Sequence, residues 1–166
     1  MLNINFSSNF TADNNILPSK SVLNKDYGNK LNSICFTPEN VKRIINKLKS
    51  NGSSGPDKFS GLLFKNVVNE ISYPLSCIFN ISICTSSIPV IWKTAIITPI
   101  FKSGSPNEAN NYCPISLTCI SSKIIETIIK DSMLDHLNKS KLISCQQHGF
   151  LARHSTNTQL LESCND

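Results

Sequence analysis

Two kinds of hydrophobic pattern alternate along the chain, and the one typical of β-strands marks its centre. From Thr94 to Phe101, β-branched and apolar residues form a short continuous run, which predicts a strand. Ser103 to Pro106 supplies turn residues, with a glycine that tolerates a positive φ and a proline that fixes φ. A second extended segment follows at Tyr112 to Ile115. We therefore expect a β-hairpin with Lys93 and Lys102 at its two ends.

Apolar residues at helical spacing predict three helices before this hairpin. Thr37 is a suitable N-cap for the first, and Pro38 follows at the first helical position, where a missing N–H is tolerated. A second helix ends near Ile71, and a third begins at Pro74. The apolar faces of the three helices consist of Val41, Ile44, Ile45 and Leu48, of Leu62, Leu63, Val67 and Ile71, and of Leu75, Ile78, Phe79 and Ser82.

Two more helices are predicted after the hairpin. Ser121 or Ser122 can cap the first of them. The apolar residues beyond Asp131 fall on a rotated face, which allows a bend or break near this residue. Gly149 to Leu151 is a candidate short strand, and Ser155 is placed to cap the final helix. The buried stripe of the first of these helices is expected to be Ile120, Ile124, Ile125 and Ile128.

Residues 1–36 differ in composition from the rest of the chain. Asn and Ser are frequent there and no helical period is present, so we expect a flexible lead-in. Residues 37–166 are long enough to bury a sizeable core as one domain, and the 40% hydrophobic content of the chain suits a globular protein. Trp92 is expected to anchor the base of the hairpin, and Cys77 and Cys84 to be small buried hydrophobes.

Charge, cysteine content and the absence of targeting segments indicate the cellular compartment of the chain more clearly than its function. The formal net charge of +5 permits an anionic partner without requiring one. Met1 to Phe10 lacks the basic and apolar regions of a signal peptide, and no apolar run approaches the roughly 20 residues of a membrane span. We therefore expect an intracellular protein, cytoplasmic or nuclear, that is neither secreted nor in a membrane, with its seven cysteines reduced.

The loop from Asn51 to Asp57 contains two glycines and a proline. Backbone N–H groups of a Gly-rich loop can hold a phosphate, but this loop lacks the Gly-Lys-Ser/Thr ending of a P-loop. A helix-to-helix turn is the alternative interpretation. Elsewhere, Cys145 and His148 have the spacing of half a zinc site, and no second pair accompanies them, so we expect no metal.

Several short motifs follow one another in a specific order. At the hairpin they are Trp92-Lys93, Pro99-Ile100-Phe101-Lys102 and Asn111-Tyr112-x-Pro114-Ile115-Ser116-Leu117. On either side they are Gly55-Pro56-Asp57, Pro74-Leu75, Phe79-Asn80-Ile81-Ser82, Ile88-Pro89, Ser122-Lys123-Ile124-Ile125-Glu126, Gln147-His148-Gly149-Phe150, His154-Ser155-Thr156 and Gln159-Leu160-Leu161. From about residue 37 to about residue 164, this order resembles the N-terminal, fingers part of the reverse transcriptase domain of non-LTR (jockey-like) retrotransposons.

The resemblance implies an α+β, mainly helical fold, namely a partial right-hand polymerase domain with fingers, the start of the palm and one basic β-hairpin. Residues 37–166 would stop before the family's catalytic Asp motifs, which hold two metal ions. Asp166 follows no apolar strand, and Asp131 and Asp135 lack a further carboxylate nearby, so we expect no catalytic residue and no metal ligand. The complete enzyme would use Mg²⁺, an RNA template, a DNA primer and dNTPs, and the palm and thumb would be the missing intramolecular partners.

The resemblance also implies candidate nucleotide- and template-binding residues. Lys102 matches a family position that approaches the triphosphate of the incoming nucleotide, and Lys93 is a weaker match. Cys113 stands where the family has Arg, so a permanent charge and its bidentate fork are lost. The further candidates are Gly55, Pro56, Asp57, Gly149, His154 and Ser155. For His154, local capping of the final helix is an equally good interpretation.

We expect a fragment of a retrotransposon RNA-directed DNA polymerase that grips nucleic acid and dNTP and is inactive alone. A catalytically dead RNA or RNA/DNA-binding module and a non-functional retroelement relic are the alternatives. Salt-dependent RNA binding would separate the binding module from the other two, because phosphate contacts release counterions.

Overall fold

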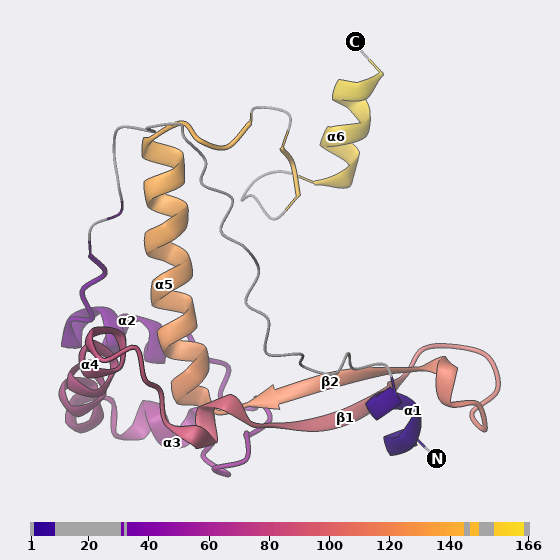
Figure 1. Cartoon of the computed structure of the whole chain (residues 1–166), viewed down its shortest axis with the longest axis horizontal. Helices are drawn as coiled ribbons and strands as arrows, with labels where there is room; N and C mark the ends of the chain where they lie inside the picture. Colours follow the sequence, from indigo (N-terminus) through magenta and orange to yellow (C-terminus); the bar gives the residue numbers. More distant parts are fainter. Residues whose placement is uncertain (1, 9–30, 32, 145–146, 150–154, 165–166) are drawn as a thin grey trace. The chain divides into compact units, whose positions relative to one another are not determined.

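The computed structural model describes residues 2–8, 31, 33–144, 147–149 and 155–164. The protein is α+β and mainly helical, with one two-stranded antiparallel sheet in the described residues, which confirms the predicted class (Figure 1). The chain divides into two compact units, residues 1–27 with 35–128 and residues 28–34 with 129–166. The described elements are α1 (Leu2–Ser8), α2 (Pro38–Lys47), α3 (Gly61–Asn66), α4 (Val68–Cys84), η1 (Val90–Lys93), β1 (Ala95–Phe101), η2 (Ala109–Asn111), β2 (Tyr112–Thr118), α5 (Ile120–Lys139) and α6 (Thr156–Ser163).

The start of α2 is as predicted. The Thr37 hydroxyl oxygen accepts a hydrogen bond from the Asn40 backbone N–H at 3.2 Å, and Pro38 occupies the first helical position. Such a cap satisfies one of the donors that a helix N-terminus leaves unpaired. The buried residues of α2 are Val41, Ile44 and Ile45, which confirms the predicted face.

The first unit is built around aromatic residues from two segments far apart in the sequence. Phe36 lies edge-on to Phe79, with ring centroids 5.6 Å apart, and both side chains are fully buried. Asn80 fixes this arrangement, because its amide donates to the Phe36 carbonyl at 2.9 Å and accepts from the Phe36 N–H at 3.3 Å. Trp92 packs edge-on against the same Phe79, also at 5.6 Å, as expected of an anchor at the hairpin base.

The prediction that a helix begins at Pro74 is wrong. Pro74 lies inside α4, which starts at Val68 and runs to Cys84. A proline inside a helix removes one backbone hydrogen bond and costs roughly 3 kcal/mol. Burial of Leu75 and Phe79 on the same helix offsets that cost. The other buried residues of α4 are Ser72, Ser76 and Ser82; the Ser72 and Ser76 hydroxyls donate to the carbonyls of Val68 and Tyr73.

Several apolar residues lie on the opposite side from the one predicted. Leu62 and Leu63 are exposed, and the buried residues of α3 are Gly61 and Phe64. Ile78 is also exposed, because the buried face of α4 passes through its serines instead. Cys84 is exposed and Cys77 is half-buried, so the expectation that both are buried is wrong.

The hairpin forms with the predicted strands, extended by three residues in β2. Its register pairs Ala95 with Thr118 at one end and Phe101 with Tyr112 at the other. Pro99 stands opposite Pro114. Antiparallel pairs alternate between those that exchange backbone hydrogen bonds and those that do not, and two prolines fit only the second kind. A slip by one residue would place a proline where the ladder needs an N–H, so the prolines help to fix the register.

The distal loop of the hairpin is closed by side-chain hydrogen bonds. The Asn111 amide donates to the Ser105 carbonyl at 2.9 Å and to a Glu108 carboxylate oxygen at 3.2 Å. Gly104 has φ +90°, and a Cβ there would lie 2.6 Å from the Asn111 amide nitrogen, so the turn requires glycine. The Tyr112 hydroxyl completes the loop by donating to the Pro106 carbonyl at 2.9 Å.

The start of α5 differs from the prediction. Neither Ser121 nor Ser122 caps it, because the helix already begins at Ile120 and both serines are buried within its first turn. The Ser122 hydroxyl donates to the Glu126 carboxylate at 2.8 Å, so its partner is a side chain one turn later. The predicted break near Asp131 does not occur, since α5 is helical from Ile120 to Lys139. The predicted stripe is confirmed: Ile120, Ile124, Ile125 and Ile128 are buried.

The two ends of the chain are described in part. Ser155 caps α6 as predicted, since its hydroxyl accepts from the Thr158 N–H at 3.2 Å. Within the expected lead-in, Leu2–Ser8 forms the helix α1, which the sequence pattern did not indicate. Residues 9–30 of the lead-in lie outside the described residues, as do Phe150 and Leu151 of the candidate strand.

Candidate functional site

Lys102 and Cys113 meet at the distal end of the hairpin. The Lys102 N–H donates to the Asn111 carbonyl at 2.8 Å, which continues the ladder one step beyond β1. Cys113 is paired with Ile100, two residues before Lys102. Residues two apart on a strand share a face, and directly paired residues do as well. Lys102 and Cys113 are therefore diagonal neighbours on one face, with side chains starting roughly 7 Å apart.

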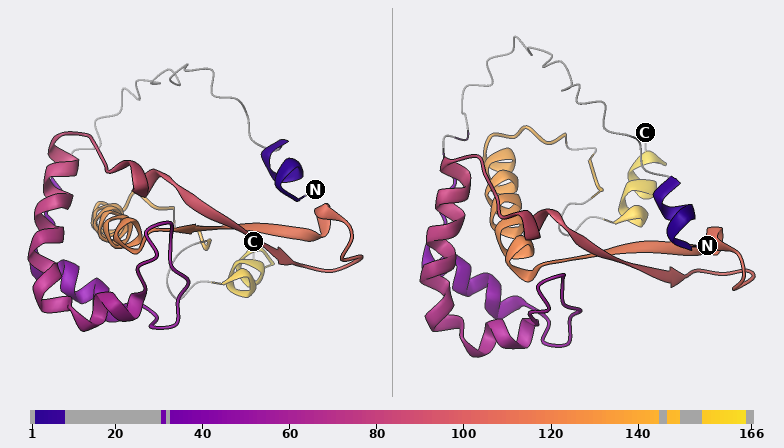
Figure 2. Two further views of the ribbon diagram at one scale, coloured as in Figure 1. Left: turned by 90° about the horizontal axis from the view of Figure 1, so that it is seen from below. Right: turned by 60° about the horizontal axis from the view of Figure 1, so that its bottom comes forward.

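Lys93 lies at the opposite end of the arm. It is the last residue of η1, immediately before the strands, and its side chain is exposed. β1 spans Ala95 to Phe101, and at about 3.3 Å per residue this separates the two hairpin ends by about 20 Å. Figure 2 shows both strands leaving the helices side by side in each view. Lys93 and Lys102 therefore cannot hold the same phosphate group.

Gly55 lies directly against the junction of β2 and α5. A Cβ at Gly55 would lie 2.5 Å from the Cys119 nitrogen and 2.6 Å from the Thr118 carbonyl oxygen. Backbone atoms cannot yield that much, so only glycine permits this approach. The predicted site loop thus comes next to the hairpin base, which its position in the sequence does not reveal.

Asp57 shares this junction with Cys119. Its carboxylate accepts a hydrogen bond from the Phe59 N–H at 3.2 Å, in a turn that starts at Gly55. The Cys119 side chain is fully buried, and its thiol donates to the Ile91 carbonyl at 3.5 Å. Burial raises the pKa of this thiol, and the nearby Asp57 carboxylate acts in the same direction. Cys119 thus connects the site loop, η1 and the start of α5.

The remaining candidates lie in the second unit. Ser155 serves as the cap of α6, and its own N–H donates to the Thr158 hydroxyl at 2.9 Å. His148 is buried, with Nδ1 2.9 Å from the same hydroxyl. The Gly149 carbonyl accepts from the Gln147 side-chain amide at 3.0 Å. His154 lies outside the described residues, as does the Cys145 half of the weighed zinc pair.

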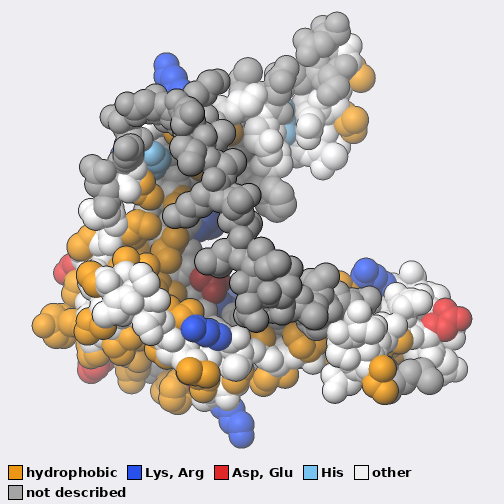
Figure 3. Space-filling model, viewed as in Figure 1, with side chains coloured by type: hydrophobic (Ala, Val, Ile, Leu, Met, Phe, Trp, Pro, Cys, Tyr) orange, Lys and Arg blue, Asp and Glu red, His pale blue; other side chains and the backbone are white. Residues whose placement is uncertain are grey.

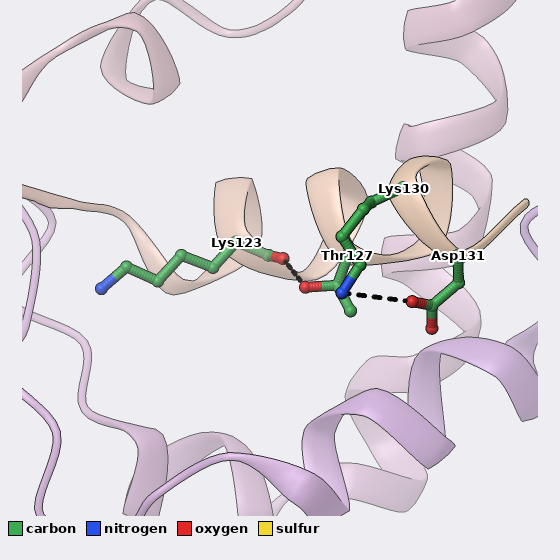
Figure 4. Close-up of polar contacts among 4 residues, drawn as sticks. All are labelled: Lys123, Thr127, Lys130 and Asp131. Carbon is green, nitrogen blue, oxygen red and sulfur yellow. Dashed lines mark hydrogen bonds and ion pairs between the residues drawn. The ribbon is translucent and has the colours of Figure 1, made fainter. Parts of the chain in front are cut away.

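The metal-ligating side chains of the described residues are not clustered. These residues contain no group of three or more His, Cys, Asp or Glu side chains able to hold a metal ion. Asp135 pairs with Lys139 at 2.7 Å and Asp131 with Lys130 at 3.3 Å, as Figure 4 shows for the second pair.

No helix in the described part of the chain combines the length and hydrophobicity needed to span a membrane.

Sequence comparison identifies the class of protein that the chain resembles. No protein-family model matches it. Over about three quarters of its length, however, it is similar to RNA-directed DNA polymerases of mobile elements. This similarity confirms the resemblance to the reverse transcriptases of jockey-like non-LTR retrotransposons.

Among these relatives is the RNA-directed DNA polymerase from mobile element jockey of Drosophila melanogaster. The two are 32% identical over 125 residues, which cover 75% of this chain and 14% of the relative. The probable RNA-directed DNA polymerase from transposon BS of the same species is 32% identical over 133 residues, with coverages of 77% and 15%. The jockey polymerase of Drosophila funebris is 30% identical over 125 residues, with coverages of 75% and 14%. The chain therefore spans about one seventh of the length of the curated relatives it matches.

Proposed function

We propose that this stretch is the part of an RNA-directed DNA polymerase that holds nucleic acid and the incoming nucleotide, namely the fingers and the start of the palm. One observation carries the proposal: the hairpin brings Lys102 and Cys113 onto one face at its distal end. These are the two positions at which the resemblance implies phosphate contacts. The similarity to polymerases of mobile elements supports an RNA template and a DNA primer as partners.

The charge at this face is lower than the resemblance implies. Lys102 is exposed and offers a compact ammonium group on a flexible stem. Cys113 offers a weak S–H donor in place of a guanidinium, so it provides neither charge nor a bidentate contact. The grip on a triphosphate would then depend on Lys102 and on cations elsewhere in the stretch.

The proposal assigns no chemical step to the described residues, because they provide no set of carboxylates for metal ions. Gly55, Pro56 and Asp57 would hold the hairpin base in position beside the template and primer. Gly149, His154 and Ser155 remain proposed template contacts. Mg²⁺, dNTP chemistry and the catalytic carboxylates would belong to other parts of such a polymerase.

Binding and primer extension, measured on the same preparation, test this function. The chain should bind a primer–template with an affinity that falls as salt rises. Lys102→Gln should weaken binding and reduce the salt slope by about 1, because it removes one phosphate contact. Lys42→Gln is the matched control, since the Lys42 ammonium already donates to the Asn69 side chain at 2.6 Å.

No primer extension is expected with Mg²⁺ and dNTPs. Absence of nucleic-acid binding at low salt would overturn the proposed function. Extension that is lost on changing Asp131→Asn would show instead that the stretch contributes catalytic carboxylates.

A further inference from the structure

The two strands of the hairpin have the composition of strands that pair readily with further strands. Both β1 and β2 contain β-branched and aromatic residues, and neither contains a charged residue. Within the described residues no third strand joins them, so each has one edge without a strand neighbour. Uncharged segments of high β-propensity with an open edge are prone to recruit strands from other chains.

Proline is the feature that protects this sheet, because the other common protections are not found in its described strands. The pairing of β1 with β2 is continuous along both strands, so no bulge bends an edge away. Every residue of β1 and residues 114–116 of β2 are exposed, so no described element covers the sheet there. Lys93 and Lys102 lie outside the strands. Only Pro99 and Pro114 interrupt the two strands from within.

The register shows in which direction the two missing N–H groups would point. The Lys102 N–H donates to the Asn111 carbonyl, so these two residues face each other with their hydrogen-bonding groups. Pairs with and without mutual hydrogen bonds alternate along an antiparallel ladder. Counted from Lys102, Pro99 and Pro114 form a pair of the second kind, whose backbone groups point away from the partner strand. Pro99 therefore removes a donor from the outer edge of β1, and Pro114 removes one from the outer edge of β2.

Each proline interrupts the row of donors that a further strand would need. On the outer edge of β1, the remaining outward N–H groups belong to Ala95, Ile97 and Phe101. A strand added there would direct a carbonyl at the ring of Pro99 and would lose a ladder hydrogen bond. The same holds for Pro114 on the outer edge of β2.

We propose that Pro99 and Pro114 keep copies of this chain from joining edge to edge through their hairpins. Two β1 edges would pair about a two-fold axis, and with the axis near residue 99 both copies would present a proline at the centre of the contact. An ordinary residue at this position would add two backbone hydrogen bonds at once, one donated by each copy. The inference does not depend on the proposed function, because it concerns backbone groups and not the side chains of Lys102 and Cys113.

Sedimentation velocity of the full chain over a concentration series tests this inference. Pro99→Val restores an outward N–H and should raise the self-association constant about tenfold or more over the wild type, given two added hydrogen bonds. Pro114→Val is the equivalent change at the edge of β2. Thr98→Val is the matched control, because the Thr98 N–H points inward to β2 and the substitution adds no outward donor. It should leave the association constant unchanged.

A second variant at the same position separates edge pairing from damage to the hairpin. Pro99→Lys also restores the N–H and also lacks the proline ring, but a lysine on an open edge disfavours strand addition. It should therefore associate no more than the wild type. In associated Pro99→Val, hydrogen exchange should slow at the outward N–H groups of Ile97 and Phe101, while the inward N–H of Thr98 keeps its rate.

Three results would overturn the inference. The first is that Pro99→Val and Pro114→Val associate no more than the wild type. The second is that Thr98→Val associates as strongly as Pro99→Val, which would assign the effect to β-propensity alone. The third is that Pro99→Lys associates as strongly as Pro99→Val, which would assign it to a disrupted hairpin.

Discussion

Cys113 stands at the position where the resemblance to jockey-like reverse transcriptases implies an Arg. It sits diagonally across the ladder from Lys102, on the same face. When this stretch replaces the matching stretch of a jockey polymerase, Cys113→Arg should add charge-assisted hydrogen bonds worth roughly 1.5–3 kcal/mol, or about one to two decades in apparent nucleotide affinity. The gain should appear mainly in KM for dNTP.

Two matched variants make this prediction specific. Cys113→Lys should recover less than Arg, because a point charge makes no bidentate contact, and Cys113→Ser should recover almost nothing. Steady-state dNTP kinetics on the three variants is the measurement. If Arg and Ser behave alike, Cys113 does not face a phosphate and the hairpin does not lie over the nucleotide.

Sequence alone identified candidates at both ends of the hairpin, but not Cys119 or its contact with Gly55 at the base. Lys102 and Cys113 became candidates through the order of motifs that carries the resemblance. The alternation of side chains along paired strands then places both on one face. The contacts of Gly55 and Cys119 join segments more than sixty residues apart in the chain. No local pattern encodes such an approach; the nearest signal was a glycine followed by proline in a loop.

At the scale of elements, local sequence rules predicted where several helices begin, whereas burial in the tertiary structure decided whether a helix continues past a proline. The caps Thr37 and Ser155 and the hairpin register follow from side-chain chemistry within a few residues. The split at Pro74 failed because a local rule for proline was applied where buried residues on both sides keep α4 continuous. The prediction of a cap at Ser121 or Ser122 failed because α5 starts one residue earlier, at Ile120, and both serines are buried within its first turn.

The cost of Pro74 can be measured against a proline in a favourable position. Pro74→Ala should stabilise the protein by about 1–2 kcal/mol, since it restores a backbone donor within α4 and the gain is partly offset by a more flexible unfolded chain. Pro38→Ala is the control. Proline at the first helical position removes no helical hydrogen bond, so the native Pro38 should be neutral or slightly stabilising. Urea unfolding of both variants provides the comparison. Equal effects at the two positions would show that α4 is not under strain at Pro74.

At the scale of the whole molecule, much apolar surface is exposed. Figure 3 shows hydrophobic side chains gathered on the outer surface of α2 to α4. Tyr73 and Ile81 are 67% and 61% exposed, and every residue of β1 is exposed. A two-stranded sheet is marginal in water by itself, and large apolar patches usually mark contact surfaces. These faces would be covered if, as proposed, the stretch works within a longer polymerase, of which the matched residues are 14%.

The separation of Lys93 and Lys102 predicts how binding depends on ligand length. The hairpin places the two lysines about 20 Å apart, which equals about six steps of a duplex at 3.4 Å per base pair. A DNA stem of ten base pairs can therefore contact both lysines, whereas a stem of four can contact only one. Lys102→Gln should lower the salt slope by about 1 on the long stem. On the short stem the effect should be smaller, because Lys93 can hold the stem in place of Lys102. Stems carrying identical loops, titrated by anisotropy, control for contacts outside the duplex. A slope lowered equally on both stems would mean that the nucleic acid does not follow the arm.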